Sequence, residues 1–496
     1  MKKHIKALIF SIFAFSGILI TSSCSSDSKE RDAAEATSAL IEANEKIVAF
    51  GHVDAMNILN NSDYKNIPKV NIILGSVLGN WKKGLEIDKP IYYALEAPFS
   101  QNGTPESVYA IINIKNKDSL SSIISEMGYS LEKEGDISFH QEDDVTFGIR
   151  EKLLIIISKP GDYDGKVKIK EAFTFTEGDL SEDKTQEIIE QKGDIVAGVD
   201  IARLFTTSNT SLENLPADKK DELTNLVEDA FVKTVVNFEN GAINFESNNL
   251  FSDELKDKLF FKDKNGSTLV SQLGGGNPWM GVAVNLDLRK GEDFISSYLP
   301  DGKKDLISGL PTEVKFALLT LGENPLSKLF SGQAGFVLNG DPKSAMGMEL
   351  EYSSFLGMGP KGEILQQLLK EQFGAFGIKN GDTYEVGELK VKLAKKGIYA
   401  SSGKGNSGKI NLPSYAKNFG EDSFSMFIAF EKMDVASLEL EDEAKVIEIL
   451  QYMTVNVNRD GTKVIVAAKN KNTNILKQIK DYYTKQIMDK IDGMGA

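Results

Sequence analysis

Cys24 is the only cysteine in the chain, and its thiol is the side chain best suited to covalent chemistry. It follows a lysine-rich start, an apolar run from Ala7 to Ile20, and three small polar residues at 21–23. This order is typical of a secretory signal peptide, which we predict at residues 1–23. The apolar run is shorter than the ~20 residues that a membrane-spanning helix needs. An uncleaved anchor helix with an incidental cysteine is the alternative interpretation.

The stretch Ile20–Cys24 resembles the cleavage motif of bacterial lipoproteins, in which the cysteine accepts a lipid. It departs from the motif at Thr21, where leucine is usual. The resemblance implies that Cys24 is the lipidation site and carries acyl chains such as palmitate. Each buried methylene of such a chain contributes about 0.8 kcal/mol to membrane binding. We therefore expect an outer-membrane lipid anchor, with the protein periplasmic or surface-exposed.

The charge and the histidine count exclude several classes of function. Removing residues 1–23 takes away three lysines and no acid, so the net charge of −15 becomes −18. Such a charge repels nucleic acid, and we expect no nucleic-acid partner. After lipidation no thiol remains, and His52 and His140 are the only histidines left. A multi-histidine metal site is therefore disfavoured, and we expect no metal or other cofactor.

Two loops carry residue types that bind phosphates or cations. Gly403–Lys409 has the spacing of a phosphate-binding loop, but Ile410 stands where a magnesium-binding Ser or Thr belongs, and Pro413 prevents the helix that should follow. We expect no nucleotide. The stretch from His140 to Asp144 offers an imidazole and three carboxylates where two strands should turn. It could hold a cation, but a solvated acidic loop is the favoured interpretation.

Trp81 and Trp279 are the only tryptophans, and each could stack against a ligand. Because both lie close to glycine or proline, packing at the edge of a lobe is the favoured alternative. Trp279 follows Gly274–Pro278, which we expect to link two lobes, and it is the first aromatic to test. His52 and Asp54 share a face of a predicted strand, where a buried histidine is favoured over a catalytic base.

One pattern recurs four times along the chain: alternating apolar residues, an acid, and apolar residues that begin a helix. Each copy predicts a strand that runs into a helix. The Asn240-Gly241 and Asp460-Gly461 pairs predict the tight turns of two hairpins. The four patterns lie at 47–59, 195–205, 280–295 and 424–438, with acids at Asp54, Asp200, Asp287 and Glu431.

These elements recur in the same order, so that Asp54 corresponds to Asp287 and Gly241 to Gly461, which predicts an internal duplication. We expect a flexible tether at 24–45, in which 33–41 could be a short helix, and two similar lobes at 46–270 and 275–490. Another helix is predicted at 119–127 with Asp118 as its cap. Hairpin strands and helices with one apolar face predict an α+β fold, with antiparallel sheets covered by helices on one face.

A wider resemblance is carried by Ile20–Cys24, by IVAFGHVDAMNIL at 47–59 and by YAIINIKNKDSLSSIISEMG at 109–128. These stretches resemble an uncharacterised bacterial (Bacteroidota-type) lipoprotein family, of the domain of unknown function 4836 kind. The family has no known catalytic residues, so the resemblance implies a location and no active site.

Three functions remain open. The leading hypothesis is a non-enzymatic, lipid-anchored envelope protein that binds or scaffolds a protein or another envelope component, in a cleft between the lobes near Trp279. The second is a carrier of an apolar ligand such as a lipid, which predicts a strand-lined cavity with few polar groups. The third is a hydrolase, which would need paired acids in a cleft and which no catalytic motif supports.

Overall fold

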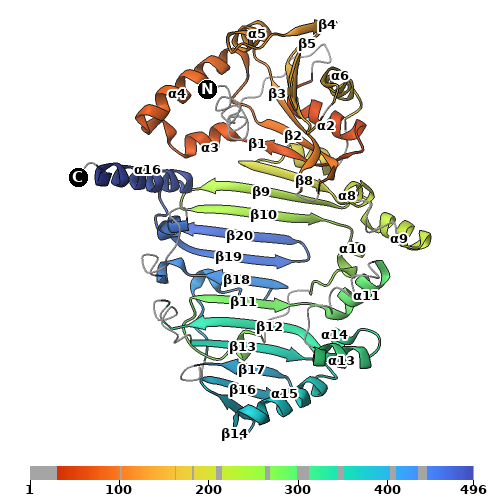
Figure 1. The fold of residues 1–496 in the computed structure, drawn as a ribbon, viewed down its shortest axis with the longest axis vertical. Coiled ribbons are helices and arrows are strands. Elements are labelled where there is room, and N and C mark those ends of the chain that lie inside the picture. Colours follow the sequence, from red (N-terminus) through yellow and green to blue (C-terminus); the bar gives the residue numbers. More distant parts are fainter. Residues whose placement is uncertain are drawn as a thin grey trace. The chain divides into compact units, whose positions relative to one another are not determined.

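The computed structural model describes residues 31–494, except 101–102, 162, 181–183, 208–214, 263–268, 299–311, 341, 343–350, 403–408 and 434–443. Cys24, the signal peptide and most of the loop at 403–409 therefore lie outside the described residues. The chain forms two compact units (Figure 1). Unit 1 comprises Met1–Leu212, Glu228–Leu250 and Asn472–Ala496, and unit 2 comprises Glu213–Val227 and Phe251–Lys471.

Unit 1 is built on an antiparallel sheet with the strand order β10-β9-β8-β1-β2-β3-β7-β6-β5-β4. The strands are β1 (Ile47–Val53), β2 (Ile91–Phe99), β3 (Pro105–Asn113), β4 (Glu132–Glu134), β5 (Ile137–Glu142), β6 (Val145–Arg150), β7 (Leu153–Ser158), β8 (Ile195–Asp200), β9 (Phe231–Glu239) and β10 (Ala242–Leu250). The helices are α2 (Ala33–Ala43), α3 (Ala55–Asn61), η1 (Tyr64–Asn66), α4 (Pro68–Gly84), α5 (Lys117–Glu126), α6 (Gly165–Phe175), α7 (Lys184–Ile189), α8 (Ile201–Thr207) and α16 (Ile475–Met494).

Helices lie on both faces of this sheet, which corrects the prediction of helices on one face. Strand β7 shows the reason, because it is apolar at every position from Leu153 to Ile157. Leu153, Ile155 and Ile157 pack in a core with α2 and α6, whereas Leu154 and Ile156 pack in a second core with α5. Figure 1 shows α4 and α5 on one side of these strands and α2 and α6 on the other. A strand that is buried on both faces loses the alternation of polar and apolar residues.

The strands of unit 2 are also antiparallel and pair in the order β20-β19-β18-β11-β12-β13-β17-β16-β15-β14. The strands are β11 (Met280–Asn285), β12 (Phe330–Asn339), β13 (Glu351–Met358), β14 (Ile378–Asn380), β15 (Thr383–Val386), β16 (Leu389–Ala394), β17 (Gly397–Ser401), β18 (Phe424–Ile428), β19 (Leu450–Asn458) and β20 (Gly461–Ala468). The helices are α9 (Ala217–Val227), α10 (Asp253–Lys258), η2 (Val270–Gln272), α11 (Leu288–Tyr298), α13 (Thr312–Thr320), α14 (Pro325–Leu329), α15 (Glu363–Phe376), η4 (Ser414–Ala416), η5 (Phe430–Lys432) and η7 (Ala444–Ile449).

The strands of the two units pair in the same order, since each strand of unit 1 has a counterpart in unit 2 whose label is higher by ten. Both predicted hairpins are confirmed: Glu239 pairs with Ala242 across the first turn, and Asn458 pairs with Gly461 across the second. The described chain is therefore an α+β protein with antiparallel sheets.

Two of the acids in the recurring pattern begin helices in the predicted way. Asp200 is the last residue of β8, and its Oδ1 accepts a hydrogen bond of 2.9 Å from the backbone N–H of Arg203. Asp287 follows β11, and its Oδ1 accepts one of 3.1 Å from Lys290 N–H. A carboxylate in this position satisfies one of the free N–H groups of the first helical turn.

The predicted tether is structured from Asp32 onward. The side chain of Asp32 caps α2 by accepting hydrogen bonds from Ala34 N–H and Glu35 N–H. Ala36 and Leu40 of α2 have no exposed surface and belong to the main core of unit 1. The short helix that the sequence allowed at 33–41 is therefore present. The prediction that residues 33–45 form a flexible tether is wrong, because the apolar face of this helix is wide enough to complete a core.

The unit boundaries also differ from the predicted 46–270 and 275–490. The final helix α16 belongs to unit 1, where Asn474 donates a hydrogen bond of 2.6 Å to the Phe238 carbonyl and Lys477 pairs with Asp63. Helix α9 belongs to unit 2, where Tyr298 Oη donates to Glu222 Oε1 at 2.5 Å. The expected linker at 274–278 lies inside unit 2. Among the described residues, no helix has both the length and the apolar character that crossing a bilayer requires.

Candidate functional site

The candidate site is a cavity of about 640 Å³ in unit 1. It lies on the face of the sheet that α4 and α5 cover in part, and its lining is predominantly apolar. Strands β1, β2, β3, β5, β6 and β7 contribute most of its surface. The volume falls within the ~300–1,000 Å³ that is usual for small-molecule sites.

The floor of the cavity is one row of residues that pair directly across neighbouring strands. Tyr93 pairs with Ala110, Ala110 with Ile156, Ile156 with Phe147, and Phe147 with His140. Directly paired residues in an antiparallel sheet point to the same face. Ala110 is the smallest side chain of the row and lies between larger ones, so it leaves a hollow in the floor.

Helix α5 and the turn after it form one wall. Ile124 and Met127 line the cavity, and Gly128 then adopts φ +90°, which lets the chain turn so that Tyr129 also reaches the lining. The helix begins two residues earlier than predicted, because Asn116 and not Asp118 is its cap and accepts a hydrogen bond of 2.8 Å from Ser119 N–H. Trp81 of α4 completes the wall.

Aromatic rings gather at one end of the cavity. The rings of Tyr129 and His140 lie 5.2 Å apart, those of His140 and Phe147 5.5 Å, and those of Tyr129 and Phe147 6.1 Å. His140 Nδ1 lies 2.8 Å from the Ser130 carbonyl, and this contact fixes the orientation of the imidazole. The cluster therefore presents aromatic surface to a ligand.

The polar groups of the cavity lie at its edges. Tyr93 Oη donates a hydrogen bond of 3.1 Å to the Val196 carbonyl. Burial raises the pKa of Tyr93 to about 12, so its hydroxyl stays protonated at neutral pH. At the rim, the exposed residue Glu142 ends β5, and the exposed residues Asp143 and Asp144 form the turn to β6.

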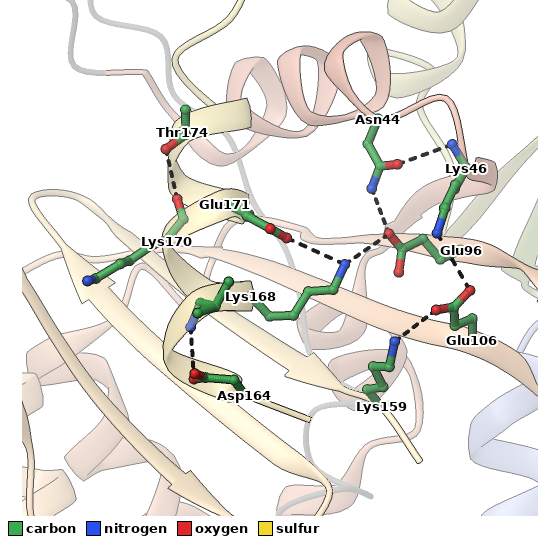
Figure 2. Close-up of polar contacts among 11 residues, drawn as sticks. Asn44, Lys46, Glu96, Glu106, Lys159, Asp164, Lys168, Lys170, Glu171 and Thr174 are labelled. Atoms are coloured by element: carbon green, nitrogen blue, oxygen red, sulfur yellow. Dashed lines mark hydrogen bonds and ion pairs between the residues drawn. The ribbon is translucent and has the colours of Figure 1, made fainter. Parts of the chain in front are cut away.

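A buried ionic network supports the same strands from the opposite face (Figure 2). Glu96 of β2 is 1% exposed and accepts a hydrogen bond of 2.8 Å from Asn44 Nδ2, while Lys168 Nζ lies 3.6 Å away. Burial by itself would raise the pKa of Glu96, but the hydrogen bond from Asn44, the nearby Ser107 hydroxyl and the charge of Lys168 outweigh it and lower that pKa. Glu106 of β3 binds Lys159 at 2.8 Å.

The structure separates the two tryptophans that the sequence singled out. Trp81 lines the cavity of unit 1. Trp279 is 6% exposed, and its backbone joins two strand ends of unit 2, donating to the Leu338 carbonyl at 3.0 Å and accepting from Ala429 N–H at 2.7 Å. It therefore has no free face for a ligand to stack on.

His52 and Asp54 are both buried in unit 1. His52 Nε2 contacts the Gln191 carbonyl at 2.8 Å, and burial lowers the pKa of His52. Burial raises the pKa of Asp54 to about 7, and the nearby carboxylate of Asp194 contributes. Within the described ranges, no three His, Asp or Glu side chains converge as a metal site would require.

Most of the cavity was missed in the sequence. Tyr93 and Ala110 lie in apolar runs at 91–95 and 108–112, and Phe147 lies in a strand whose polarity alternates. Nothing local distinguishes any of the three from ordinary buried sheet residues. The available signal was the set of unbroken apolar runs at 91–95, 108–112 and 153–157, which indicates strands with two covered faces.

No protein-family model matches the chain, and no curated protein matches it. Solved structures titled as crystal forms of TP0453 are similar over part of the chain. Form I has a TM-score of 0.28 and 8% identity, covering 48% of this chain and 90% of that one. Form III has a TM-score of 0.27 and 9% identity, covering 46% and 89%. At these TM-scores the likeness has no bearing on function.

Proposed function

We propose that this chain is a lipid-anchored protein of the bacterial cell envelope, and that unit 1 binds the apolar part of a small ligand, such as an acyl chain, without catalysing a reaction. The observation that carries the proposal is the strand-lined apolar cavity of about 640 Å³. Burying methylenes releases about 0.8 kcal/mol each, so eight of them would supply about 6 kcal/mol, enough for measurable affinity.

The position of the tryptophans favours this carrier function over a scaffold with its site near Trp279. Trp279 is 6% exposed and packed within unit 2, whereas Trp81 lines a cavity large enough for a ligand. The lining also favours binding over hydrolysis. The acids among its described residues lie exposed at the end of β5 and in the turn that follows it. His140, the imidazole among those residues, is held by a backbone carbonyl and two aromatic rings.

The anchor and the family remain part of the proposal. Ile20–Cys24 supports lipidation at Cys24 and a position on the outer membrane, periplasmic or surface-exposed, where apolar molecules are at hand. The same residues, with 47–59 and 109–128, support membership of the lipoprotein family named above. We also propose that the two units arose by duplication, which is supported by their identical strand order. A protein or other envelope component as partner remains a second proposal.

Calorimetric titration with decanol, a neutral ten-carbon chain, tests the cavity directly. We expect the protein to bind decanol and the emission of Trp81 to change on binding. Val108→Glu places a charge in the lining and should weaken binding at least tenfold, because an apolar chain would then have to lie against a carboxylate.

The matched control is Val167→Glu, the same substitution at a residue of α6 that is 49% exposed. It should bind decanol as the unmodified protein does. Folded protein that binds no decanol, or equal binding by Val108→Glu, would refute the proposed function.

A further inference from the structure

The cavity of unit 1 is longer across its strands than along them. Among the described residues, at most three on the same face of one strand line it, as Leu154, Ile156 and Ser158 do on β7. Alternate residues of a strand lie ~7 Å apart, so this dimension is about 13 Å. Across the sheet, the lining comes from six neighbouring strands in the order β1-β2-β3-β7-β6-β5. Strands lie ~4.8 Å apart, so this dimension is about 24 Å.

The floor of the cavity is accessible along the whole row that runs from Tyr93 to His140. Each of the five residues of this row is partly exposed. The chain neighbours of its three inner members point to the opposite face and are all buried, namely Tyr109, Ile111, Ile155, Ile157, Thr146 and Gly148. Strands β3, β7 and β6 each have a partner on both sides, so the exposed surface of the row faces the cavity. The row is therefore a continuous surface that an apolar chain can cover.

The row has the length of a long acyl chain. It crosses five strands, and the four spacings between them make about 19 Å. An extended chain advances ~1.2 Å per bond, as the polypeptide backbone does with three bonds per residue, so about sixteen carbons cover this distance. If each carbon takes the volume of a water molecule, ~30 Å³, such a chain needs roughly 500 Å³. The cavity of about 640 Å³ holds one chain of this length and is too small for two.

Ala110 lies in the path of such a chain. It is the second residue of the row, between Tyr93 of β2 and Ile156 of β7. Its methyl group leaves the floor low at this point, whereas a branched side chain would divide the row. The part from Ile156 to His140 crosses only two strand spacings, about 10 Å, which suits about eight to ten carbons.

We infer that the ligand of this cavity carries one long chain of about fourteen to sixteen carbons, extended across the strands, and that Ala110 determines this length. The inference rests on the proposed function and specifies its ligand class.

Alkyl maltosides with chains of eight, ten, twelve and fourteen carbons test this inference, because they share one uncharged head group. Each is titrated calorimetrically below the concentration at which it forms micelles. For the unmodified protein we expect the affinity to rise about two- to fourfold with each added methylene, because each one removes more apolar surface from water. The fourteen-carbon maltoside should therefore bind at least about fifteenfold more tightly than the ten-carbon one.

The variant Ala110→Ile should stop this rise at about ten carbons. A β-branched side chain suits a strand, so the substitution changes the floor and keeps the sheet. The ratio of affinities between the fourteen- and ten-carbon maltosides should fall below about threefold, because the longer chain can no longer cross position 110. The matched control is Ala375→Ile, the same substitution at an exposed position of α15 in unit 2, which should keep the full ratio.

The outcomes separate the two claims. If folded protein binds neither decanol nor any maltoside, the proposed function fails. If decanol binds but no maltoside does, or if the affinity of the unmodified protein stops rising at ten carbons, only the chain-length inference fails. A full ratio in Ala110→Ile would also overturn it. If Ala110→Ile unfolds by circular dichroism, Ala110→Val, which adds less volume, and the series on the unmodified protein decide.

Discussion

Two buried carboxylates in unit 1 have pKa values that are shifted in opposite directions. Asp54 is 7% exposed, follows β1 and lies near Asp194, so its charged form is poorly stabilised and its pKa rises to about 7. Glu96 is also deeply buried, but hydrogen bonds and Lys168 stabilise its charge, and its pKa is lowered. The two residues should therefore affect stability in opposite directions as the pH changes.

Replacing Asp54 should stabilise the protein at alkaline pH. The folded-state pKa of about 7 exceeds the unfolded value of 3.8, so the folded protein holds the proton more tightly, and stability falls as pH rises from about 4 to 7. Asp54→Asn removes this loss and should raise the free energy of unfolding by about 1–3 kcal/mol at pH 8, with little change near pH 4. Urea unfolding of both proteins at pH 4 and pH 8 measures this change in the free energy of unfolding. An equal change at the two pH values would contradict the prediction.

Replacing Glu96 should destabilise the protein at neutral pH. Its folded-state pKa lies below the unfolded value of 4.5, so its contribution to stability is present above that value and is lost as pH falls through the folded pKa. Glu96→Gln should cost about 1–3 kcal/mol at pH 7, because Lys168 loses its buried partner. The cost should shrink in acid. Urea unfolding across pH 3 to 7 would show this, and a cost independent of pH would count against it.

At the scale of elements, α2 is a core helix whose sequence is typical of a linker. Its segment is Ala-rich and follows a serine-rich stretch, which is typical of a linker. Small alanines nevertheless allow close packing against a sheet, and Ala33, Ala36 and Leu40 have no exposed surface. Helix α2 is therefore a structural part of unit 1.

Leu40→Ala tests the place of this helix. It should lower the free energy of unfolding by about 2–5 kcal/mol, as expected for a core leucine, because the cavity it leaves cannot fully close. Val167→Ala, on the exposed face of α6, should change it by less than about 1 kcal/mol. Thermal unfolding followed by circular dichroism compares the two variants. A similar small loss of stability in both would favour the flexible tether that the sequence predicted.

Local patterns predicted the elements better than they predicted the site. The Asn240-Gly241 and Asp460-Gly461 turns, and the strand-to-helix transitions at Asp200 and Asp287, are confirmed because each depends on a few neighbouring residues. The cavity depends on pairing between β2, β3, β5, β6 and β7, which brings Tyr93 and His140 onto one face across intervening strands. Residue spacing within one segment does not reveal which strands will be neighbours. Of the lining, the sequence therefore singled out only Trp81 and the stretch from His140 to Asp144, the latter as a possible cation loop.

At the scale of the whole molecule, neither unit is made of one continuous segment. Unit 1 includes α16 from the end of the described chain, and unit 2 includes α9 from between two segments of unit 1. The linker expected at 274–278 would have divided the chain at the wrong place, because Gly276 pairs with Ile410 inside unit 2. The helices that cross this expected boundary could be assigned only from three-dimensional contacts.

Removing residues 472–496 should destabilise unit 1 selectively. Unit 1 would lose the Asn474 hydrogen bond to Phe238 and the pairing of Lys477 with Asp63. Trp81 in the Trp279→Phe background reports on unit 1, and Trp279 in the Trp81→Phe background reports on unit 2. Truncation should lower the urea midpoint of the first reporter by more than that of the second. Equal shifts, or no shift, would contradict this assignment of α16.

The placement of α16 has a consequence for biogenesis. If the polypeptide leaves the cytoplasm from its N-terminal end, most of unit 1 arrives first, yet the helix that completes it arrives only after unit 2. Until then, the surface of β9 and α3 that receives this helix stays open to chaperones and proteases of the receiving compartment. Secretion that stalls near the end of translation should therefore leave a protease-sensitive N-terminal portion, even though most of its residues have already been delivered.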